Sequence, residues 1–343
     1  MSESRVARAP GRVNLIGDHT DYTGGLVLPM AIDRETVVRV EPSAAAEVVL
    51  HSGEEQGEAR VPIDVDDPSA LRPSWARYVG AVVAEVRPVH GWRGVVRSTV
   101  PVGAGLSSSA ALEVACALAL GAPSDDPLAL ARLCQRAEHR AVGVPSGIMD
   151  QLASCAGVAG AALLIDCHLG SVTPSPLPPP GEVEVVVVHS GQARTLAGSA
   201  YAQRVAQCAA AEAEVGPLRL ADPDAVERIA DPVVRARARH VVTENARVRA
   251  VAAALAAGDV VSAGRAMDAS HVSLAGDYAV STPVLDALCD RLRARPGVFG
   301  ARLTGAGFGG CVVALCRPGA LAGEGWVVRA VGGASVRDAP AGE

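Results

Sequence analysis

The sequence of 343 residues contains no lysine, and all 31 of its basic residues are arginines. A P-loop protein needs a lysine on the β- and γ-phosphates of its nucleotide, and a protein kinase needs one on an early strand. Both classes are therefore excluded. Any phosphoryl chemistry in this chain has to rely on arginine, backbone amides and a metal ion.

Aromatic residues are also scarce, at 3% of the chain, and the net charge is −6. Proteins that bind single-stranded nucleic acid combine stacking aromatics with a basic groove, so we expect no nucleic-acid partner. No uninterrupted apolar run reaches membrane-spanning length, and we expect no membrane partner. With 49% apolar and 20% charged residues, the composition is typical of a globular protein.

The chain lacks Cys-x-x-Cys pairs and has no apolar segment near its N-terminus. Several of its eight cysteines lie within apolar runs, which favours buried free thiols over zinc sites or disulfides. The missing apolar segment argues against a secretory signal, and reduced thiols fit a cytoplasmic location. We expect a cytoplasmic monomer.

Strand and helix patterns are mixed in both halves of the chain, which predicts a two-domain α+β fold. Strands are expected at 6–16, 36–40, 48–51, 95–100, 161–167, 183–190, 300–303, 311–316 and 326–330. Helices are expected at 108–120, 127–141, 198–214, 234–256, 258–272 and 282–295. Five prolines within 171–182 predict a semi-rigid connector, so we place the domains at 1–182 and 183–343.

A glycine-rich segment at 101–115, PVGAGLSSSAALEVA, leads from a predicted strand into a helix. Gly103 and Gly105 allow the backbone to approach a ligand closely, and serines then open the helix. Free amides and the positive dipole end at a helix N-terminus form an anion site, usually for phosphate. A glycine turn with an ordinary serine N-cap explains this segment equally well.

A polar cluster follows the first predicted strand in APGRVNLIGDHTDYTGG, at 9–25: Asp18, His19, Thr20, Asp21 and Tyr22. Carboxylates accept hydrogen bonds from sugar hydroxyls, so the cluster suits a polyhydroxyl ligand. The alternative is a polar turn closed by two glycines. A metal site at His19 and Asp21 is less well supported, because no matching cluster stands out elsewhere.

Two carboxylates flank a tight turn in AEHRAVGVPSGIMDQLASCAG, at 137–157. One of Glu138 and Asp150 could bind magnesium while the other acts as a base, although ordinary helix-surface positions explain both residues. A fourth segment, LTGAGFGGCVVAL at 303–315, is a glycine loop between two predicted strands. It fits a bulged hairpin as well as it fits close approach to a ligand.

In this order and spacing, the segments resemble the GHMP kinases, and within them the galactokinase family. GRVNLIGDHTDYTGG is similar to the signature of that family, whereas GAGLSSSAA and LTGAGFGGC are similar to motifs shared by GHMP kinases. The resemblance runs from about Arg5 to Ala334. It implies a ribosomal-protein-S5-like N-terminal domain, a ferredoxin-like C-terminal domain and an active site between them. It also implies that the protein uses ATP and Mg²⁺ to phosphorylate a small-molecule sugar, D-galactose, at its anomeric hydroxyl.

The resemblance further implies roles for individual residues. Arg12 assists phosphoryl transfer, and Asp150 is the catalytic base. The implied sugar ligands are Asp18, His19, Thr20, Asp21, Gly147 and Tyr201. The ATP phosphates are surrounded by Gly103, Ala104, Gly105, Leu106, Ser107, Ser108 and Ser109, with Ser52 and Trp75 near the nucleotide. Magnesium is held by Ser109 and Glu138.

The chain departs from the family at Asp18, which the resemblance places at the sugar's 6-hydroxyl and where glutamate is usual. It also departs at Ser146, where cysteine or asparagine is common. Neither change removes a group needed for phosphoryl transfer. Two alternatives stay open: a 1-kinase for arabinose, N-acetylgalactosamine or a uronic acid, and a sugar sensor built on an inactive kinase. The intact Ser109, Glu138 and Asp150 favour the enzyme.

Overall fold

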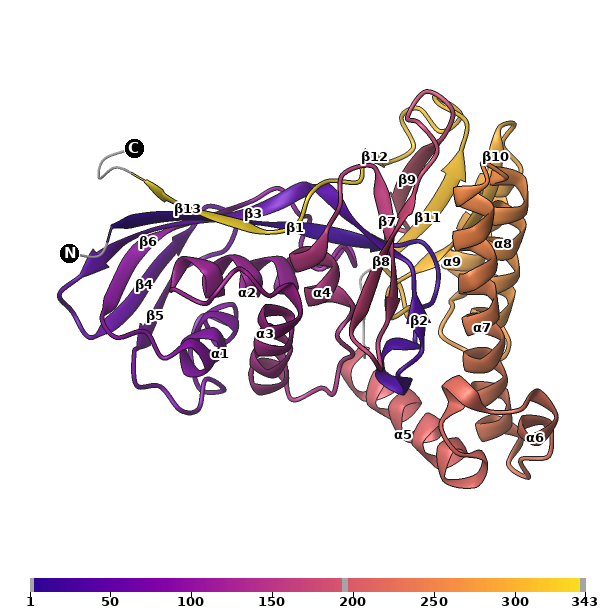
Figure 1. Cartoon of the computed structure of the whole chain (residues 1–343), viewed down its shortest axis with the longest axis horizontal. Coiled ribbons are helices and arrows are strands. Elements are labelled where there is room, and N and C mark those ends of the chain that lie inside the picture. Colours follow the sequence, from indigo (N-terminus) through magenta and orange to yellow (C-terminus); the bar gives the residue numbers. More distant parts are fainter. Residues whose placement is uncertain (1–2, 193–196, 340–343) are drawn as a thin grey trace.

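The computed structural model describes residues 3–192 and 197–339, and its largest sheet has six strands (Figure 1). Their order is β13-β1-β3-β6-β4-β5. They are β1 (Ser4–Asn14), β3 (Pro29–Ser43), β4 (Glu47–Ser52), β5 (Glu58–Pro62), β6 (Gly91–Ser98) and β13 (Ser335–Ala339). Four helices lie along one side of this sheet: α1 (Ala76–Val86), α2 (Ser108–Ala119), α3 (Pro127–Val142) and α4 (Met149–Ala156).

The second half of the chain builds an antiparallel sheet in the order β10-β11-β9-β12. Its strands are β9 (Glu184–His189), β10 (Val298–Thr304), β11 (Cys311–Cys316) and β12 (Trp326–Val328). Helices α8 (Val260–Ala275) and α9 (Pro283–Arg293) pack on these strands, and α7 (Pro232–Ala256) packs on α8. Beside α7 lie α5 (Ala197–Val215), the short η2 (Leu218–Leu220) and α6 (Pro223–Glu227).

A small sheet connects the two halves: β2 (Leu26–Val27), β7 (Ala161–Asp166) and β8 (Ser171–Pro176). Its strand β7 contacts β3 on one side, whereas β2 and β8 contact α7 on the other. The loop between β1 and β2, which carries the polar cluster, therefore passes through the middle of the molecule, between both halves (Figure 1).

The predicted α+β class is confirmed, and several helices begin at side-chain caps that the sequence supplies, among them α3, α7, α8 and α9. Helix α3 shows why: the Asp126 carboxylate accepts the amides of Leu128 and Ala129, and Pro127 occupies the first turn. The helix ends at Gly143, whose φ of 69° is the left-handed conformation that glycine tolerates. The pattern did not predict α1, β5 or β13.

The connector predicted at 171–182 is wrong for its first six residues, which form β8. This strand pairs with β7 alone and lies at the edge of its sheet. An edge strand leaves one row of amide positions unpaired, so prolines such as Pro174 and Pro176 are tolerated there.

The domain boundary at 182/183 stays a prediction, but the second part does not form a separate continuous unit. Strand β13 returns to the first sheet and pairs with β1, with Ser4 opposite Ala339. The start of β1 and the end of β13 consequently lie at the same end of the molecule (Figure 1). The last strand of the chain thus closes the sheet that the first strand begins.

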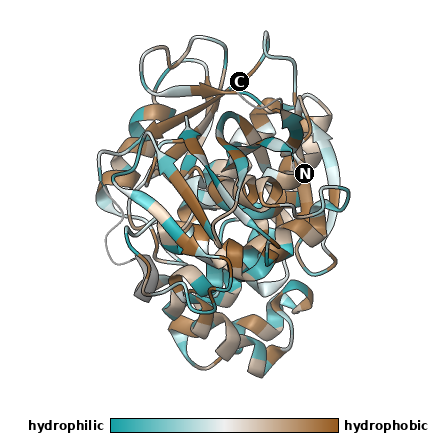
Figure 2. Ribbon diagram, turned by 90° about the vertical axis from the view of Figure 1, so that its left-hand side faces the viewer, coloured by the Kyte–Doolittle hydropathy of each residue, from teal (hydrophilic) through white to brown (hydrophobic). Residues whose placement is uncertain are grey.

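Apolar and polar stretches are mixed over the ribbon when it is coloured by hydropathy (Figure 2), and strands such as β11 are apolar throughout. All eight cysteines are free thiols, and all but Cys167 are buried, as the sequence predicted. Within residues 3–192 and 197–339, no helix is both long enough and apolar enough to cross a membrane.

Candidate active site

A bulge in β1 carries Arg12 to the glycine-rich loop. The pairing of β1 with β3 shifts register between Pro10 and Arg12, and a side chain at Gly11 would lie 2.6 Å from the Leu106 carbonyl oxygen. Only glycine allows this approach, which lets the Arg12 amide donate to the same oxygen at 3.1 Å. The first predicted motif and the phosphate motif are therefore joined through their backbones.

The N-terminus of α2 is open toward a cavity. Ser107 has a left-handed φ of 58° and does not cap the helix, because its hydroxyl donates to Asp150 instead. The predicted serine N-cap is thus corrected. The first amides of α2 keep their hydrogen-bonding capacity for a ligand, and the helix dipole favours an anion there.

Arg12 and Asp150 form a two-pronged ion pair. Nε and Nη2 of Arg12 each donate to a separate Asp150 oxygen at 2.7 Å, and Nη1 donates to the Gly105 carbonyl oxygen at 2.6 Å. A guanidinium held at three points fixes the plane of the carboxylate. The Asp150 side chain stays 27% exposed, so its carboxylate is oriented yet open to a ligand.

Two cavities meet at this ion pair. The first, about 370 Å³, is lined by the α2 N-terminus and by Ser52, Glu54 and Trp75. The second, about 330 Å³, is lined by the polar loop after β1. Both cavities share four lining residues: Arg12, Tyr78, Glu138 and Asp150. A phosphate donor in the first cavity and a hydroxyl acceptor in the second would therefore meet at Asp150.

The predicted phosphate-loop residues divide into two groups. Those that line the first cavity are Gly103, Gly105, Ser107, Ser108 and Ser109. Ala104 and Leu106 are buried in the apolar core and line neither cavity. Ser52 lies at the cavity, where its hydroxyl oxygen accepts the amides of Glu54 and Glu55 and shapes the loop after β4.

The predicted sugar residues are also divided. Those that line the second cavity are Asp18, His19, Asp21, Gly147 and Tyr201. Thr20 lies behind them: it is fully buried, and its hydroxyl lies at hydrogen-bonding distance from the carbonyl oxygens of Gly17 and Leu26, at 2.8 and 2.6 Å. The geometry gives Thr20 a role in holding the loop rather than in touching its ligand.

The imidazole of His19 is engaged at both nitrogens. Nε2 lies 3.2 Å from the Ala306 carbonyl oxygen, and Nδ1 lies 3.1 Å from the Tyr22 hydroxyl. Burial, with help from nearby His240, lowers the pKa of His19 to about 3, so the ring is neutral. Since a carbonyl only accepts, Nε2 carries the proton and Nδ1 accepts from Tyr22. A sugar hydroxyl at His19 would have to share one of these bonds.

Asp21 lines this cavity without a basic partner within the part of the chain that the structure describes, as does Glu138. Arg12 pairs with Asp150, and Arg302 pairs with Asp18. Burial raises the pKa of Asp21 to about 7, and the negative charges of Asp150 and Asp18 act in the same direction. Asp21 therefore changes charge close to neutral pH.

Gly147 is required by the position of Asp21. A side-chain carbon at residue 147 would lie 1.9 Å from Asp21 Oδ2 and 2.1 Å from its Cγ. We predict that Gly147→Ala displaces the Asp21 carboxylate and weakens sugar binding roughly tenfold or more, the value of one hydrogen bond to a charged group. Calorimetric titration with sugar measures this change. Gly181→Ala is the control, because a side chain there meets no atom within 4 Å; equal affinities in the two variants would contradict the prediction.

Glu138 and Ser109 present two oxygen ligands beside the α2 N-terminus. Ser109 Oγ lies 3.3 Å from Glu138 Oε1, and Glu138 Oε2 accepts from Ser146 at 2.7 Å and from Gln151 at 3.0 Å. Magnesium is usually held by one or two carboxylates together with substrate phosphates and water, so this donor set fits the ion. The described residues contain no cluster of three or more His, Cys, Asp or Glu side chains that would form a complete protein cage.

Sequence reasoning missed several residues of the site. Gln151 bridges Glu138 and the buried Glu113, to which its Nε2 donates at 3.1 Å. Burial, and then the charge of Glu138, raise the pKa of Glu113 well above its ordinary value. Tyr78 comes from α1, a helix that the pattern did not predict, and Arg302 comes from β10. A polar side chain within an apolar strand, as at Arg302, was the available signal.

A kinase that acts on a small alcohol requires two cavities that open onto one carboxylate, one for phosphate and one for the polyhydroxyl ligand. Three family models match the chain. They are the galactokinase galactose-binding signature at 1–42, the GHMP kinases N terminal domain at 77–158 and the GHMP kinases C terminal at 251–324.

Individual relatives agree with these matches. The galactokinase of Chloroflexus aurantiacus is 45% identical over 331 residues, which cover 91% of this chain and 84% of the relative. Human galactokinase is 43% identical over 323 residues, covering 90% and 82%. The structure of Lactococcus lactis galactokinase in complex with galactose superposes with a TM-score of 0.86 at 29% identity, covering 97% of this chain and 95% of that one. The chain belongs to the galactokinase family of GHMP kinases, and the predicted family fold is confirmed.

Proposed function

We propose that the chain transfers the γ-phosphate of ATP to the anomeric 1-hydroxyl of D-galactose, giving galactose 1-phosphate and ADP. The observation that carries the proposal is the ion-paired Asp150 at the junction of the two cavities. GHMP kinases use ATP, and a relative of the same family was solved with galactose bound.

The residues at the junction suggest how the reaction proceeds. Asp150 accepts the proton of the 1-hydroxyl as that oxygen attacks the γ-phosphorus, and ADP leaves with the former bridging oxygen. Arg12 orients Asp150 and lies beside the charge that develops on the transferring group. The open amides of α2 bind phosphate oxygens. An anomeric hydroxyl is more acidic than an ordinary alcohol, so a carboxylate is an adequate base.

Magnesium is part of the proposal. When bound, it neutralises charge on the ATP phosphates, and Ser109 and Glu138 are the residues that would hold it. We predict that Ser109→Ala and Glu138→Gln each raise the Mg²⁺ concentration needed for half-maximal activity, because each removes an oxygen ligand or its charge. A Mg²⁺ titration at fixed ATP measures the shift.

The control for this titration is Glu85→Gln, which neutralises an α1 carboxylate that pairs with Arg136 outside both cavities. Its Mg²⁺ requirement should equal that of the wild type. Unchanged titrations in both Ser109→Ala and Glu138→Gln would show that the ion is held elsewhere.

The substrate assignment is tested by ATP consumption with a panel of free sugars. We expect galactose to give the highest kcat/KM among galactose, arabinose, N-acetylgalactosamine and galacturonic acid. A higher value for another sugar would replace galactose as the substrate, and the absence of turnover with all of them would favour the sensor. The proposed physiological form is a cytoplasmic monomer, and the eight free thiols fit the reducing compartment.

A further inference from the structure

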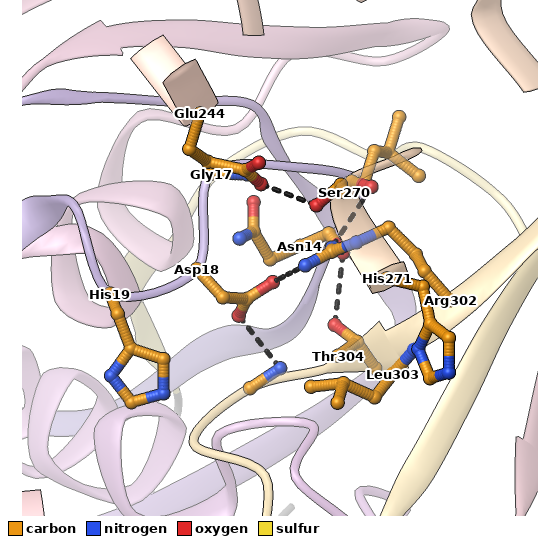
Figure 3. A network of polar contacts seen from close by, with 12 residues as sticks. Asn14, Gly17, Asp18, His19, Glu244, Ser270, His271, Arg302, Leu303 and Thr304 are labelled. Atoms are coloured by element: carbon orange, nitrogen blue, oxygen red, sulfur yellow. Dashed lines mark hydrogen bonds and ion pairs between the residues drawn. The ribbon is translucent and has the colours of Figure 1, made fainter. Parts of the chain in front are cut away.

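A buried ion pair joins the two halves of the chain behind the sugar cavity (Figure 3). Arg302 extends from β10, is 0% exposed, and donates from Nη2 to Asp18 Oδ2. Its Nη1 lies 3.4 and 3.1 Å from the carbonyl oxygens of Asn14 and Leu15. One guanidinium therefore fixes both a carboxylate of the sugar loop and the backbone that leads into that loop.

The residues after Arg302 reinforce this support. Three more hydrogen bonds connect them to the loop: Thr304 Oγ1 to the Asn14 carbonyl at 2.9 Å, the Gly305 amide to Asp18 Oδ1 at 2.8 Å, and His19 Nε2 to the Ala306 carbonyl at 3.2 Å. Two of these residues, Gly305 and Ala306, also line the cavity. Gly305 and Ala306 thus form part of the cavity wall, and the segment 302–306 as a whole holds the loop after β1 in place.

Asp18 is bonded from behind and still borders the cavity. Arg302 and Gly305 each occupy one of its two oxygens, whereas a carboxylate has about four acceptor positions. Asp18 lines the cavity with a side chain that is only 2% exposed, so a sugar hydroxyl reaches it through a small part of its surface. The orientation of the carboxylate is set by Arg302, which is fully buried and bonded through both Nη1 and Nη2.

Arg302 also balances charge at this end of the cavity. Four carboxylates line it, Asp18, Asp21, Glu138 and Asp150, and Arg12 already pairs with Asp150. Without Arg302, Asp18 would join Asp21 and Glu138 in having no basic partner, and a buried unpaired carboxylate is costly to keep ionised. Asp18 would then turn away or cease to act purely as an acceptor.

We propose that Arg302 is a positioning residue for sugar recognition: it holds Asp18 as a fixed acceptor for one sugar hydroxyl and thereby sets specificity at that end of the cavity. The inference rests on the proposed function, which supplies a sugar as the occupant. It places a specificity determinant on a strand of the second half of the chain, although Arg302 itself does not line the cavity.

The test is a double-mutant cycle on galactose affinity, measured by calorimetry with Arg302→Lys, Asp18→Asn and the two together. Lysine keeps the charge but cannot span Asp18 and two carbonyls at once. We expect Arg302→Lys and Asp18→Asn each to weaken galactose binding roughly tenfold or more. The dissociation constant of the double variant for galactose should lie within about threefold of that of Asp18→Asn, because Arg302 acts through Asp18.

A second readout separates positioning from a general structural role. The ratio of kcat/KM for galactose over 6-deoxygalactose should fall in Arg302→Lys, because the resemblance assigns Asp18 to the 6-hydroxyl. Two other quantities should stay within about twofold of the wild-type values: the ratio of kcat/KM for galactose over 2-deoxygalactose, and the KM for ATP. Arg219→Lys is the matched control. It alters another two-pronged pair between the two halves, with Asp166 at 2.7 and 2.9 Å, that lines neither cavity.

Each outcome decides the proposal. The proposal is overturned if the loss of galactose affinity in the double variant equals the product of the losses in the two single variants. It is also overturned if Arg302→Lys and Arg219→Lys bind galactose and discriminate between sugars equally well. If Arg302→Lys does not fold, Arg302→Met combined with Asp18→Asn removes both buried charges, and galactose affinity equal to that of Asp18→Asn is then expected. A wild-type protein that does not phosphorylate galactose would instead overturn the proposed function.

Discussion

Replacement of Asp150 by asparagine should leave a folded protein that binds ATP and galactose but turns over at least ~100-fold more slowly, the lower end of what general-base catalysis contributes. Asparagine keeps the shape of the carboxylate and one acceptor for Arg12. It cannot take the proton of the 1-hydroxyl, and it loses the second prong of the ion pair. Steady-state kinetics give kcat, and calorimetry and thermal unfolding check binding and folding.

Asp166→Asn is the matched control for this variant. Asp166 also accepts two hydrogen bonds from one arginine, Arg219, but lines neither cavity. Its turnover should stay close to that of the wild type. A kcat for Asp150→Asn near the wild-type value would mean that another group accepts the proton.

Galactose binding should depend on pH through Asp21. Its pKa of about 7 in the sugar-free protein means that the group is protonated below neutral pH, whereas the ionised form is the stronger acceptor for a sugar hydroxyl. Binding therefore releases a proton, and the affinity falls as pH drops below 7 and is constant above it. We expect a dissociation constant roughly 30-fold higher at pH 5.5 than at pH 8.

Asp21→Asn isolates this effect, because asparagine cannot titrate. The variant should bind galactose more weakly than the wild type at pH 8, yet its affinity should vary little between pH 5.5 and 8. Calorimetry in buffers of different ionisation enthalpy should also show that galactose binding to Asp21→Asn no longer releases a proton. A wild-type affinity that is constant over this range would place the titration of Asp21 far from neutrality or remove Asp21 from the sugar site.

Local patterns predicted the parts of the structure that local physics controls. The apolar strand at 311–316 coincides with β11, and α3 begins at an aspartate cap followed by proline and ends at a glycine. The glycine-rich loop that leads into α2 was predicted for the same reason. By contrast, β13 is five residues long, and its partner β1 lies more than 300 residues earlier in the chain. No periodic signal of that length identifies a partner so distant.

The sequence by itself determined the family, the two motifs that supply phosphate and sugar ligands, and the absence of lysine that excludes P-loop chemistry. Only the tertiary structure decided how these parts are used. Ser107 bonds to Asp150 rather than capping α2, Gly147 must be glycine because Asp21 lies against it, and Asp18 is held by Arg302. These contacts join residues that lie 43, 126 and 284 positions apart. Packing two halves of one chain against a shared loop creates them, and no spacing within a single segment encodes that packing.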